Sequence, residues 1–580
     1  MDRKGDVLDM LRELAELTML EEGDPQSFRV RAYESASNAI ETLAKDPGLL
    51  SAKELQQIEG IGKSTAEKIR ELVQTGKVAK LELLRQKHPP SVVALLRIQG
   101  LGPKALQRLR SELGVNSLDD LRAVLTGHLL RGLKGFGPKS EDNLVRAVAR
   151  LDAQGAAGRT PISVAHPLAA RIVAKLSEVD GVSQVAICGS LRRFSETVGD
   201  VDIVVAAQAP GPVMAALVAM PLVERVLVQG DAKTSVVTHR GTQVDVRVVA
   251  AHQLGAALLY FTGSKGHNIR LRQRALVRGL TLNEYALCAI DGGRVVASET
   301  EEQIYAALGL PFVPPVLRED AGEIEAALAG ALPRPIGDVV GDFHVHTSTS
   351  GDAQSSLDEV IAAAKARRLR VLAITEHAEG TRAGVGREAL LAQRARIQER
   401  QLALGDSLRL LHGIELNIGP AGELDYDLAF RQQFDWCLAS VHDHFDLDRA
   451  AQTRRVVTAM QDPSVRMIGH LSARMIGGRP PIDLDPDAIF GAAVATGTAL
   501  EVNGALPRLD LSVEWLRRGR EQAVTFVLSS DAHDTDELAR VDFAKLNAER
   551  AWIDPARVAN SWSPDQLRAW AEAPKAAGRG

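Results

Sequence analysis

Two aspartates, Asp200 and Asp202, stand at the start of a valine-rich run that ends at Val205. In a β-strand, residues i and i+2 project from the same face, so both carboxylates would point the same way. Paired carboxylates suit Mg²⁺, and two such ions can hold the attacking and leaving oxygens of a phosphoryl transfer. The alternative is that Asp-x-Asp only caps a strand at the surface. The feature therefore predicts either a metal site or a polar strand end.

The neighbouring sequence favours the metal site. Gly189 and Ser190 precede the two aspartates and predict a turn whose backbone and hydroxyl donors can hold a phosphate. A third acid, Asp245, lies in the alternating, valine-rich run 242–249, which predicts a neighbouring strand. The three aspartates together predict a carboxylate triad with two bound Mg²⁺ or Mn²⁺ ions.

This arrangement resembles the palm of the family X DNA polymerases, the polymerase β group. The stretches 259–264 and 282–285 are also similar to that family, and the similarity extends over residues 1–315. The resemblance implies nucleotidyl transfer in which Asp245 helps to deprotonate the primer 3′-hydroxyl. It also implies contacts with the triphosphate, the sugar and the minor groove from Gly189, Ser190, Arg193, Tyr260, Phe261, Gly263, Asn268 and Arg270.

Three short repeats near the start of the chain share the pattern Gly-apolar-Gly with a lysine close by. They lie at 58–63, 98–104 and 133–139, and each precedes a helical pattern. The glycines permit a tight turn, and free N–H groups at the next helix start can receive a phosphate. The repeats resemble the helix-hairpin-helix motif, which grips the DNA backbone without reading bases. The third is either a DNA contact or structural, whereas the first two imply backbone contacts from Gly60, Gly62, Lys63, Gly100, Gly102 and Lys104.

Lys68 lies in a segment, 66–69, that is similar to the family segment carrying a deoxyribose-phosphate lyase lysine. An amine with a lowered pKa could form a Schiff base with an abasic sugar. The alternative is one more exposed lysine on a helix. Lys68 is therefore a candidate lyase residue.

Charge and composition limit the class of protein. The net charge of −5 argues against nucleic-acid binding, but residues 1–318 carry five more basic than acidic side chains and residues 319–580 ten more acidic than basic ones. The three cysteines are far apart, which favours neither a disulfide framework nor a cysteine zinc site. With no apolar run of 18 residues and no signal-peptide pattern, we expect a cytoplasmic monomer without a membrane partner.

A second group of metal-binding residue types occupies the acidic half of the chain. His-x-His at 344–346 would project both imidazoles from one face of a strand. Most of the other candidates follow apolar, strand-like runs, and a β/α barrel keeps its active site at the carboxyl ends of its strands. The nine candidates are His344, His346, Asp352, His377, Glu415, His442, His470, Asp531 and His533.

These nine positions resemble the ligand pattern of the PHP (polymerase and histidinol phosphatase) family, a distorted (β/α)7 barrel with a trinuclear metal centre. The mixed imidazole and carboxylate set suits Mn²⁺, Zn²⁺ or Fe²⁺. Arg474 either binds the phosphate or forms a surface ion pair. The resemblance implies one ion held by His344, His346, Glu415 and Asp531, a second held by Glu415, His442 and His470, and a third held by Asp352, His377 and His533.

We therefore expect a multidomain α plus α/β protein that resembles bacterial family X DNA polymerases with a PHP domain. The predicted parts are a helical, lyase-like domain (1–88), a second helix-hairpin-helix subdomain (89–152), the palm (160–260), the thumb (261–316), a linker (317–340) and the PHP barrel (341–580).

The resemblance implies that the front half adds deoxynucleotides from their triphosphates to a primer end in gapped or primed DNA during repair. The barrel would act as a 3′→5′ exonuclease, an abasic-site endonuclease or a 3′-phosphatase. One alternative is a palm that only binds DNA for the nuclease. Another is a small-molecule phosphatase in the barrel.

Overall fold

The computed structural model describes residues 3–24, 27–41, 43, 45–96, 98, 101–133, 136–137, 140–141, 143–145, 148, 159–381 and 383–573. The chain divides into two compact units, each built from several segments. The first comprises Met1–Thr160, Val164–Gly189 and Val198–Phe261, and the second comprises Pro161–Ser163, Ser190–Thr197 and Thr262–Gly580. Within the described residues, no helix has both the length and the apolar character needed to cross a membrane.

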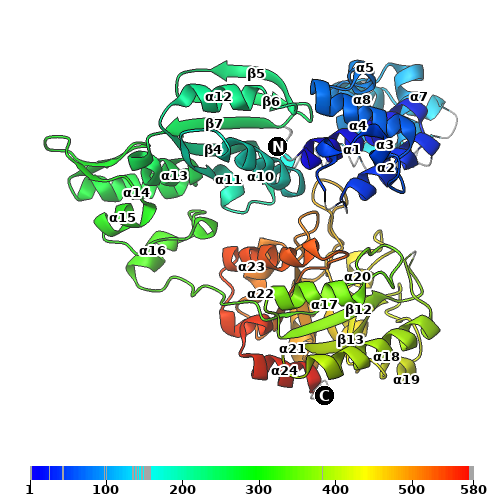
Figure 1. Cartoon of the computed structure of the whole chain (residues 1–580). Coiled ribbons are helices and arrows are strands. Elements are labelled where there is room, and N and C mark those ends of the chain that lie inside the picture. The colour runs from blue at the N-terminus through cyan, green and yellow to red at the C-terminus, as the bar shows by residue number, and fades with distance from the viewer. Residues whose placement is uncertain are drawn as a thin grey trace. The chain divides into compact units, whose positions relative to one another are not determined.

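The first unit begins with a group of helices (Figure 1). Helix α1 carries Val7, Leu11 and Leu14 at helical spacing, and all three are fully buried in the core of this group. It ends at Gly23, whose φ of +66° gives a left-handed cap. The α-helices are α1 (Lys4–Glu22), α2 (Phe28–Glu41), α3 (Ala52–Leu55), α4 (Lys63–Thr75), α5 (Ala79–Lys87), α6 (Pro90–Leu95), α7 (Pro103–Leu113) and α8 (Leu118–Thr126).

The same unit contains a mixed five-stranded sheet in the order β2-β4-β7-β6-β5. Strands β4 and β7 are parallel neighbours, and the other pairings are antiparallel. Burial alternates along most of β7, as its valine pattern predicted, whereas β4 alternates only as far as Ile203 and is buried continuously from Ile203 to Ala206. The elements are α10 (Ile162–Ser177), β2 (Val182–Ile187), β4 (Asp200–Ala207), α12 (Pro210–Val218), β5 (Val223–Gln229), β6 (Lys233–Thr238), β7 (Gln243–Val249) and α13 (Leu254–Thr262).

The second unit starts with the predicted thumb, which contains an antiparallel sheet in the order β10-β9-β8. His267, in the first turn of α14, is fully buried and hydrogen-bonded to both Glu323 and Tyr305. This network joins helices that lie far apart in sequence. The elements are α14 (Lys265–Val277), β8 (Leu280–Leu282), β9 (Leu287–Ala289), β10 (Val295–Ala297), α15 (Glu301–Ala307), the 3₁₀ helix η4 (Pro315–Leu317) and α16 (Glu323–Leu328). The short helix α11 (Gly189–Arg192) lies at a boundary between the units.

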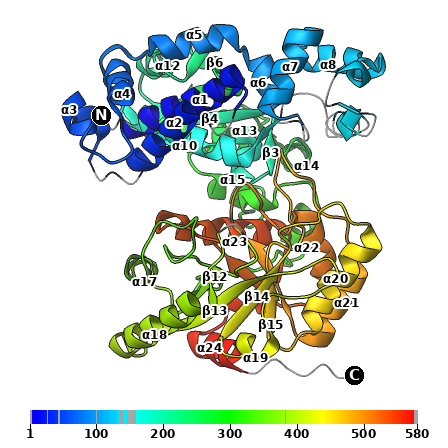
Figure 2. The same ribbon diagram turned by 90° about the vertical axis from the view of Figure 1, so that its right-hand side faces the viewer.

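The rest of the second unit is a parallel seven-stranded sheet in sequence order, β11 to β17, with helices around it (Figure 2). All seven residues of β12 are buried, as expected of a parallel strand covered on both faces. The strands are β11 (Gly341–Asp342), β12 (Val371–His377), β13 (Arg409–Asn417), β14 (Trp436–Ser440), β15 (Val465–Ile468), β16 (Ala499–Asn503) and β17 (Phe526–Ser529). The helices are α17 (Leu357–Ala366), α18 (Arg387–Leu404), α19 (Leu428–Arg431), α20 (Arg449–Gln461), α21 (Pro486–Thr496), α22 (Val513–Gly519), α23 (Arg540–Arg550) and α24 (Pro564–Glu572).

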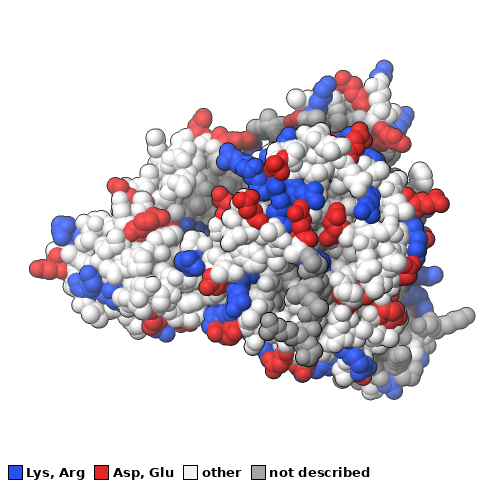
Figure 3. Space-filling view, turned by 90° about the horizontal axis from the view of Figure 1, so that it is seen from below, with Lys and Arg blue, Asp and Glu red and all other residues white. Residues whose placement is uncertain are grey.

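The parallel sheet nearly closes into a barrel. A bridge between Val345 and Ala532 joins the segment after β11 to the segment after β17. The helical region, the mixed palm sheet and this barrel confirm the predicted fold class. On the face drawn in Figure 3, acidic and basic side chains are interspersed. Neither sign of charge covers that face.

Candidate active sites and metal centres

The three predicted aspartates lie side by side on two parallel strands of the first unit. The register of β4 with β7 places Asp202 opposite Asp245. One carboxylate oxygen from each of these residues and from Asp200 lies within 4.8 Å of the others. A Cβ added at Gly189 would lie 2.2 Å from the Asp202 Oδ2 atom, and Gly189 has a φ of +64°. Only glycine therefore fits at this point of the predicted phosphate turn.

The electrostatics of this triad favour a bound cation. Burial and the neighbouring carboxylates raise the pKa of Asp202 to about 7, and burial and the charge of Asp245 raise the pKa of Asp200. Burial also acts to raise the pKa of Asp245, but hydrogen bonds from Lys233 and Gln243 outweigh it and hold that pKa below its ordinary value. A divalent cation would relieve the repulsion, so the triad fits a metal site.

Lys233 contacts the aspartate triad, and the sequence did not predict this contact. Its Nζ atom, on β6, lies 2.6 Å from the Asp245 Oδ2 atom. The register of β6 with β7 places Lys233 opposite Arg247, two residues after Asp245. Nothing in the β6 pattern distinguishes this lysine from a surface residue.

The two predicted aromatic residues lie near the strand that carries Asp245. The rings of Tyr260 and Phe261 meet edge to face, with centroids 5.1 Å apart. The Arg247 guanidinium, on β7, lies 4.5 Å from the centre of the Phe261 ring. Tyr260 is 37% exposed, which leaves its ring accessible.

Other predicted nucleotide contacts fall in the second unit. The Arg193 Nε atom donates to Glu319 at 3.1 Å, and its Nη1 atom donates to the Thr262 carbonyl. Ser190 contributes its carbonyl to a hydrogen bond from the Ser195 N–H at 3.0 Å. Arg193 therefore has two partners that a triphosphate would have to replace.

The thumb residues predicted to contact the minor groove also have hydrogen-bond or ion-pair partners within the protein. Arg270 pairs with Asp320 and, at 2.6 Å, with Glu325, and its side chain is 44% exposed. Asn268 donates its backbone N–H within the first turn of α14. Gly263 has a φ of +70°, which favours glycine. DNA contact by Arg270 would compete with two carboxylates at the surface.

In each of the first two glycine repeats, a glycine lies immediately before a helix. Gly62 and Gly102 are the N-cap residues of α4 and α7, and neither helix has a side-chain cap. Pro103, the first residue of α7, has no N–H, so that helix can offer a phosphate N–H groups only from Lys104 onward. Gly60 has a φ of +90° and would bring a Cβ to 3.0 Å from the Ser35 carbonyl. Gly100 lies outside the described residues, as do Gly135 and Lys139 of the third repeat. Lys63 and Lys104 lie in the first turns of the two helices.

Lys68 lies on α4. Its Nζ atom donates to the Ser64 carbonyl and hydroxyl at 3.1 and 2.7 Å and lies 5.8 Å from the Tyr33 ring centre. Burial lowers the pKa of Lys68, although Glu67 and Glu71 partly oppose the effect. A lowered pKa is what a Schiff-base lysine requires.

The nine predicted ligands of the barrel converge around Glu415, a fully buried residue of β13. Its two carboxylate oxygens face two groups of imidazoles. The Oε2 atom lies 2.8–3.6 Å from nitrogens of the first group and the Oε1 atom 3.0–3.3 Å from those of the second. This position suits a bridging ligand. The first group is His344, His346 and His377, and the second is His442 and His470.

Two further carboxylates complete the cluster. The Asp531 Oδ1 atom lies 3.4 and 3.6 Å from the Nε2 atoms of His344 and His346. The Asp352 Oδ2 atom lies 3.3 and 3.5 Å from the Nε2 atoms of His377 and His533. Asp531 thus lies beside two of the imidazoles implied for the first ion, and Asp352 lies beside the two implied for the third.

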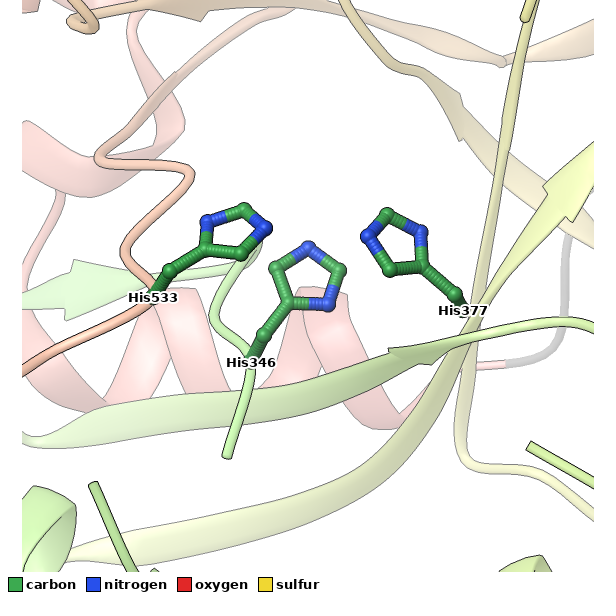
Figure 4. A group of neighbouring side chains, drawn as sticks. All are labelled: His346, His377 and His533. Carbon is green, nitrogen blue, oxygen red and sulfur yellow. The ribbon is translucent and has the colours of Figure 1, made fainter. Parts of the chain in front are cut away.

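The histidine at position 346 lies between two of the implied ion sites. Its ring lies between those of His377 and His533, with centroids 4.2 and 4.4 Å away (Figure 4). Its nitrogen also forms a potential ligand group with those two residues. The sequence implied that His346 binds one ion only, and it did not predict that His346 also lies beside His377 and His533.

The unpartnered atoms of the cluster test whether metal ions fit. The Nε2 atom of His344, both ring nitrogens of His346 and both Glu415 oxygens are buried without a hydrogen-bond partner among the described residues. Burying so many polar atoms is costly unless a ligand satisfies them. Mixed imidazole and carboxylate donors are what divalent transition metals bind. The nine residues therefore fit a metal centre.

Two residues that the sequence analysis missed orient these imidazoles. The His344 Nδ1 atom donates to Glu501 at 2.7 Å, and the His442 Nδ1 atom donates to the Asn417 side-chain oxygen at 2.6 Å. Because their Nδ1 atoms are engaged, the Nε2 atoms face the cluster. Glu501 is the third of the five residues of β16 and follows only two apolar residues, so no apolar run marked it. Asn417 is the last residue of β13, and that position could have identified it.

Protonation differs among the histidines. Burial and the charges of His377 and His533 lower the pKa of His346 to about 3. Burial acts to lower the pKa of His344 as well, but the carboxylates of Asp531, Glu501 and Glu415 outweigh it and raise that pKa. His346 is therefore held neutral, as a metal ligand must be.

Arg474 forms an ion pair with Glu196. Its Nη1 and Nη2 atoms lie 3.0 and 2.8 Å from the Glu196 carboxylate oxygens. Its Nε atom donates to the Arg508 carbonyl at 2.8 Å. The ion-pair alternative therefore holds, although the side chain of Arg474 is only 10% exposed and the pair is largely buried.

Comparison with known families assigns four segments. A helix-hairpin-helix domain matches residues 2–78, a SAM-like helix-hairpin-helix tandem matches 92–150, the DNA polymerase beta thumb matches 257–319, and the PHP domain matches 342–480. Relatives of these kinds imply dependence on divalent metal ions.

Individual relatives cover the chain to different extents. The chain is 33% identical to the DNA polymerase/3′-5′ exonuclease PolX of Bacillus subtilis over 573 residues, 98% of this chain and 99% of that protein. It is 28% identical to rat (Rattus norvegicus) DNA polymerase lambda over 331 residues, 50% of this chain and 52% of that protein. A probable phosphatase of Vibrio vulnificus is 29% identical over 236 residues, 39% of this chain and 90% of that protein. The chain belongs to the family X DNA polymerases that carry a C-terminal PHP domain.

Proposed function

We propose that this protein is a repair polymerase that fills short gaps in DNA and also removes nucleotides from 3′ ends. The observation that carries the proposal is the presence of two separate metal-binding clusters in one chain. One consists of three carboxylates, and the other combines imidazoles with carboxylates. The Bacillus subtilis relative, whose name includes both activities, supports the same pairing.

At the first cluster, Asp200, Asp202 and Asp245 would hold two Mg²⁺ or Mn²⁺ ions. Such ions, when bound, would stabilise the charge that develops on the oxygens during nucleotidyl transfer. Asp245 is the residue best suited to take the proton of the primer 3′-hydroxyl. Ser190 and the backbone at Gly189 would bind the triphosphate of the incoming deoxynucleotide.

The other predicted nucleotide contacts would complete this site. Arg193 would exchange its bonds to Glu319 and Thr262 for triphosphate oxygens, which a guanidinium binds with two donors. Tyr260 and Phe261 would pack against the sugar, and Asn268 and Arg270 would contact the minor groove.

At the second cluster, the nine barrel residues would hold up to three Mn²⁺, Zn²⁺ or Fe²⁺ ions. Such ions, when bound, would polarise a DNA phosphate and stabilise the charge of its hydrolysis. Glu415 would join two of the sites because its two oxygens face different imidazoles. Glu501 and Asn417 would keep the ligand nitrogens aimed inward.

The remaining parts would handle DNA. Gly60, Gly62, Lys63, Gly100, Gly102 and Lys104 would grip its backbone, and Lys68 would act as a lyase on abasic sugars. We also propose that the domains have the boundaries expected from the sequence, and that the protein is a cytoplasmic monomer.

Labelled gapped DNA, incubated with and without deoxynucleoside triphosphates and separated on a gel, tests the two activities. Asp200→Ala should abolish extension and leave shortening intact, because the barrel cluster is unchanged. His344→Ala should abolish shortening and leave extension intact. If either variant loses both activities while its melting temperature is unchanged, the proposal of two separate sites is wrong.

A phosphatase activity of the barrel is the second candidate, because a probable phosphatase matches 39% of this chain. Hydrolysis of histidinol phosphate, of a 3′-phosphorylated strand and of a 3′-hydroxyl strand should be compared. Preference for the small phosphate would favour this candidate over the nuclease.

A further inference from the structure

A loop after β16 holds Arg508 in a fixed position near the metal cluster of the barrel. The N–H groups of Arg508 and Leu509 both donate to the Ala505 carbonyl at 2.8 Å. The Ala505 N–H in turn donates to the Asn503 side chain at 2.9 Å. Arg474 binds the Arg508 carbonyl from the other side. The backbone that carries Arg508 is therefore anchored to the last residue of β16.

The Arg508 guanidinium has few partners. Its Nε atom lies 3.7 Å from the Asp531 Oδ2 atom, which is too long for a hydrogen bond. Its Nη1 atom is buried and has no hydrogen-bond partner among the described residues. A guanidinium offers five N–H donors, and an unsatisfied buried donor is costly. The side chain is also 22% exposed, so a ligand can reach part of it.

A second guanidinium increases the positive charge at this edge. The Arg479 Nε atom donates to the Ala473 carbonyl at 2.7 Å, and the guanidinium lies 3.8 Å from the centre of the Phe445 ring. Burial, and then the charge of Arg508, lower the pKa of Arg479. An anion near both arginines would be stabilised by their two charges. Arg474 cannot contribute in the same way, because its donors are bound to Glu196 and to backbone carbonyls.

We propose that Arg508 binds a non-bridging oxygen of the DNA phosphate held at the barrel's metal cluster, with Arg479 adding a second positive charge. The planar donors of a guanidinium match phosphate oxygens, which a lysine contacts only as a point charge. This inference rests on the proposed nuclease function. The competing explanation is that Arg508 only keeps Asp531 in place.

The experiment compares the full-length wild type with R508Q, R508K and R518Q, all loaded with Mn²⁺. Arg518 is the control, because its side chain is 50% exposed and Asp487, at 3.4 Å, is its ion-pair partner among the described residues. Three quantities are measured: bound manganese, the affinity for inorganic phosphate by calorimetry, and kcat/KM for a single-stranded oligonucleotide. Melting curves establish that each variant is folded.

R508Q should keep its manganese, bind phosphate about 10-fold more weakly and lose about 10- to 100-fold in kcat/KM, the range for a charge-assisted contact. R508K should fall between R508Q and the wild type, and R518Q should match the wild type. If R508Q loses manganese but its loaded sites bind phosphate as tightly as the wild type, the proposal is overturned. That result would mean that Arg508 only holds Asp531 in place. Wild-type phosphate affinity in both Arg508 variants would also overturn it.

The two hypotheses fail in different ways. If the wild type does not shorten DNA, the proposed nuclease function fails, whereas phosphate calorimetry still decides the role of Arg508. If the wild type shortens DNA and R508Q does so equally well, only the role of Arg508 fails.

Discussion

Replacing Gly189 with alanine should damage the aspartate triad selectively. The new Cβ would lie 2.2 Å from the Asp202 Oδ2 atom, whereas ordinary contacts begin at 3.4 Å. The carboxylate or the turn must therefore move by about 1.2 Å, and a misplacement of about 1 Å can reduce a rate by about 100-fold. A loss of about 100-fold corresponds to about 2.7 kcal/mol of transition-state stabilisation. Primer extension on gapped DNA should fall by that amount.

Gly241 provides a matched control for this experiment. Its φ is +78°, but an added Cβ would have nothing within 4 Å. Alanine at either position should cost about 1 kcal/mol of stability because of the left-handed backbone. Only Gly189→Ala should also lose extension, and both variants should keep 3′→5′ shortening of DNA. Extension by Gly189→Ala within about 3-fold of Gly241→Ala would refute the argument that Asp202 must occupy this position.

Three further substitutions test other parts of the protein. Glu501→Gln should weaken metal binding by the barrel about 10- to 100-fold, because His344 loses its charged partner. Competition with a fluorescent chelator measures the metal affinity, and Glu388→Gln, at an exposed position, is the control. Lys68→Ala should abolish borohydride trapping on abasic DNA and leave extension unchanged, whereas Lys53→Ala should still be trapped. Burial lowers the pKa of His267 despite its bond to Glu323, so the folded protein binds that proton more weakly than the unfolded chain. Stability should therefore fall as the pH drops below 6.5, by up to about 1.4 kcal/mol per pH unit, and melting curves of His267→Gln should show a weaker dependence.

The aspartate triad could be predicted because strand geometry is local. A two-residue spacing places Asp200 and Asp202 on one face regardless of the rest of the fold. The valine alternation around Asp245 predicted a strand, and the parallel register of β4 and β7 brings that residue opposite Asp202. By contrast, Lys233 contacts Asp245 because β6 pairs with β7. The sequence around Lys233 does not show which strand β6 pairs with, so this contact could not be predicted.

The barrel ligands were predictable for a different reason. Most of them follow or end an apolar run, and a parallel β/α barrel brings such positions to one end. The residues that orient them, Glu501 and Asn417, also lie near strand ends. They were missed because their role depends on which imidazole nitrogen faces inward, and that is fixed by packing between β16 or β13 and segments distant in sequence.

Arg474 and Arg508 illustrate the limit of reasoning from position. Arg474 lies four residues after the predicted ligand His470, and the sequence left phosphate binding and an ion pair both open for it. In the folded protein its donors are bound to Glu196 and to the loop that carries Arg508. Arg508 is 38 residues from His470 in sequence, but it reaches within 3.7 Å of the cluster residue Asp531. Its buried Nη1 atom has no hydrogen-bond partner among the described residues. What distinguishes the two arginines is the set of acceptors competing for each guanidinium, which only the tertiary structure determines.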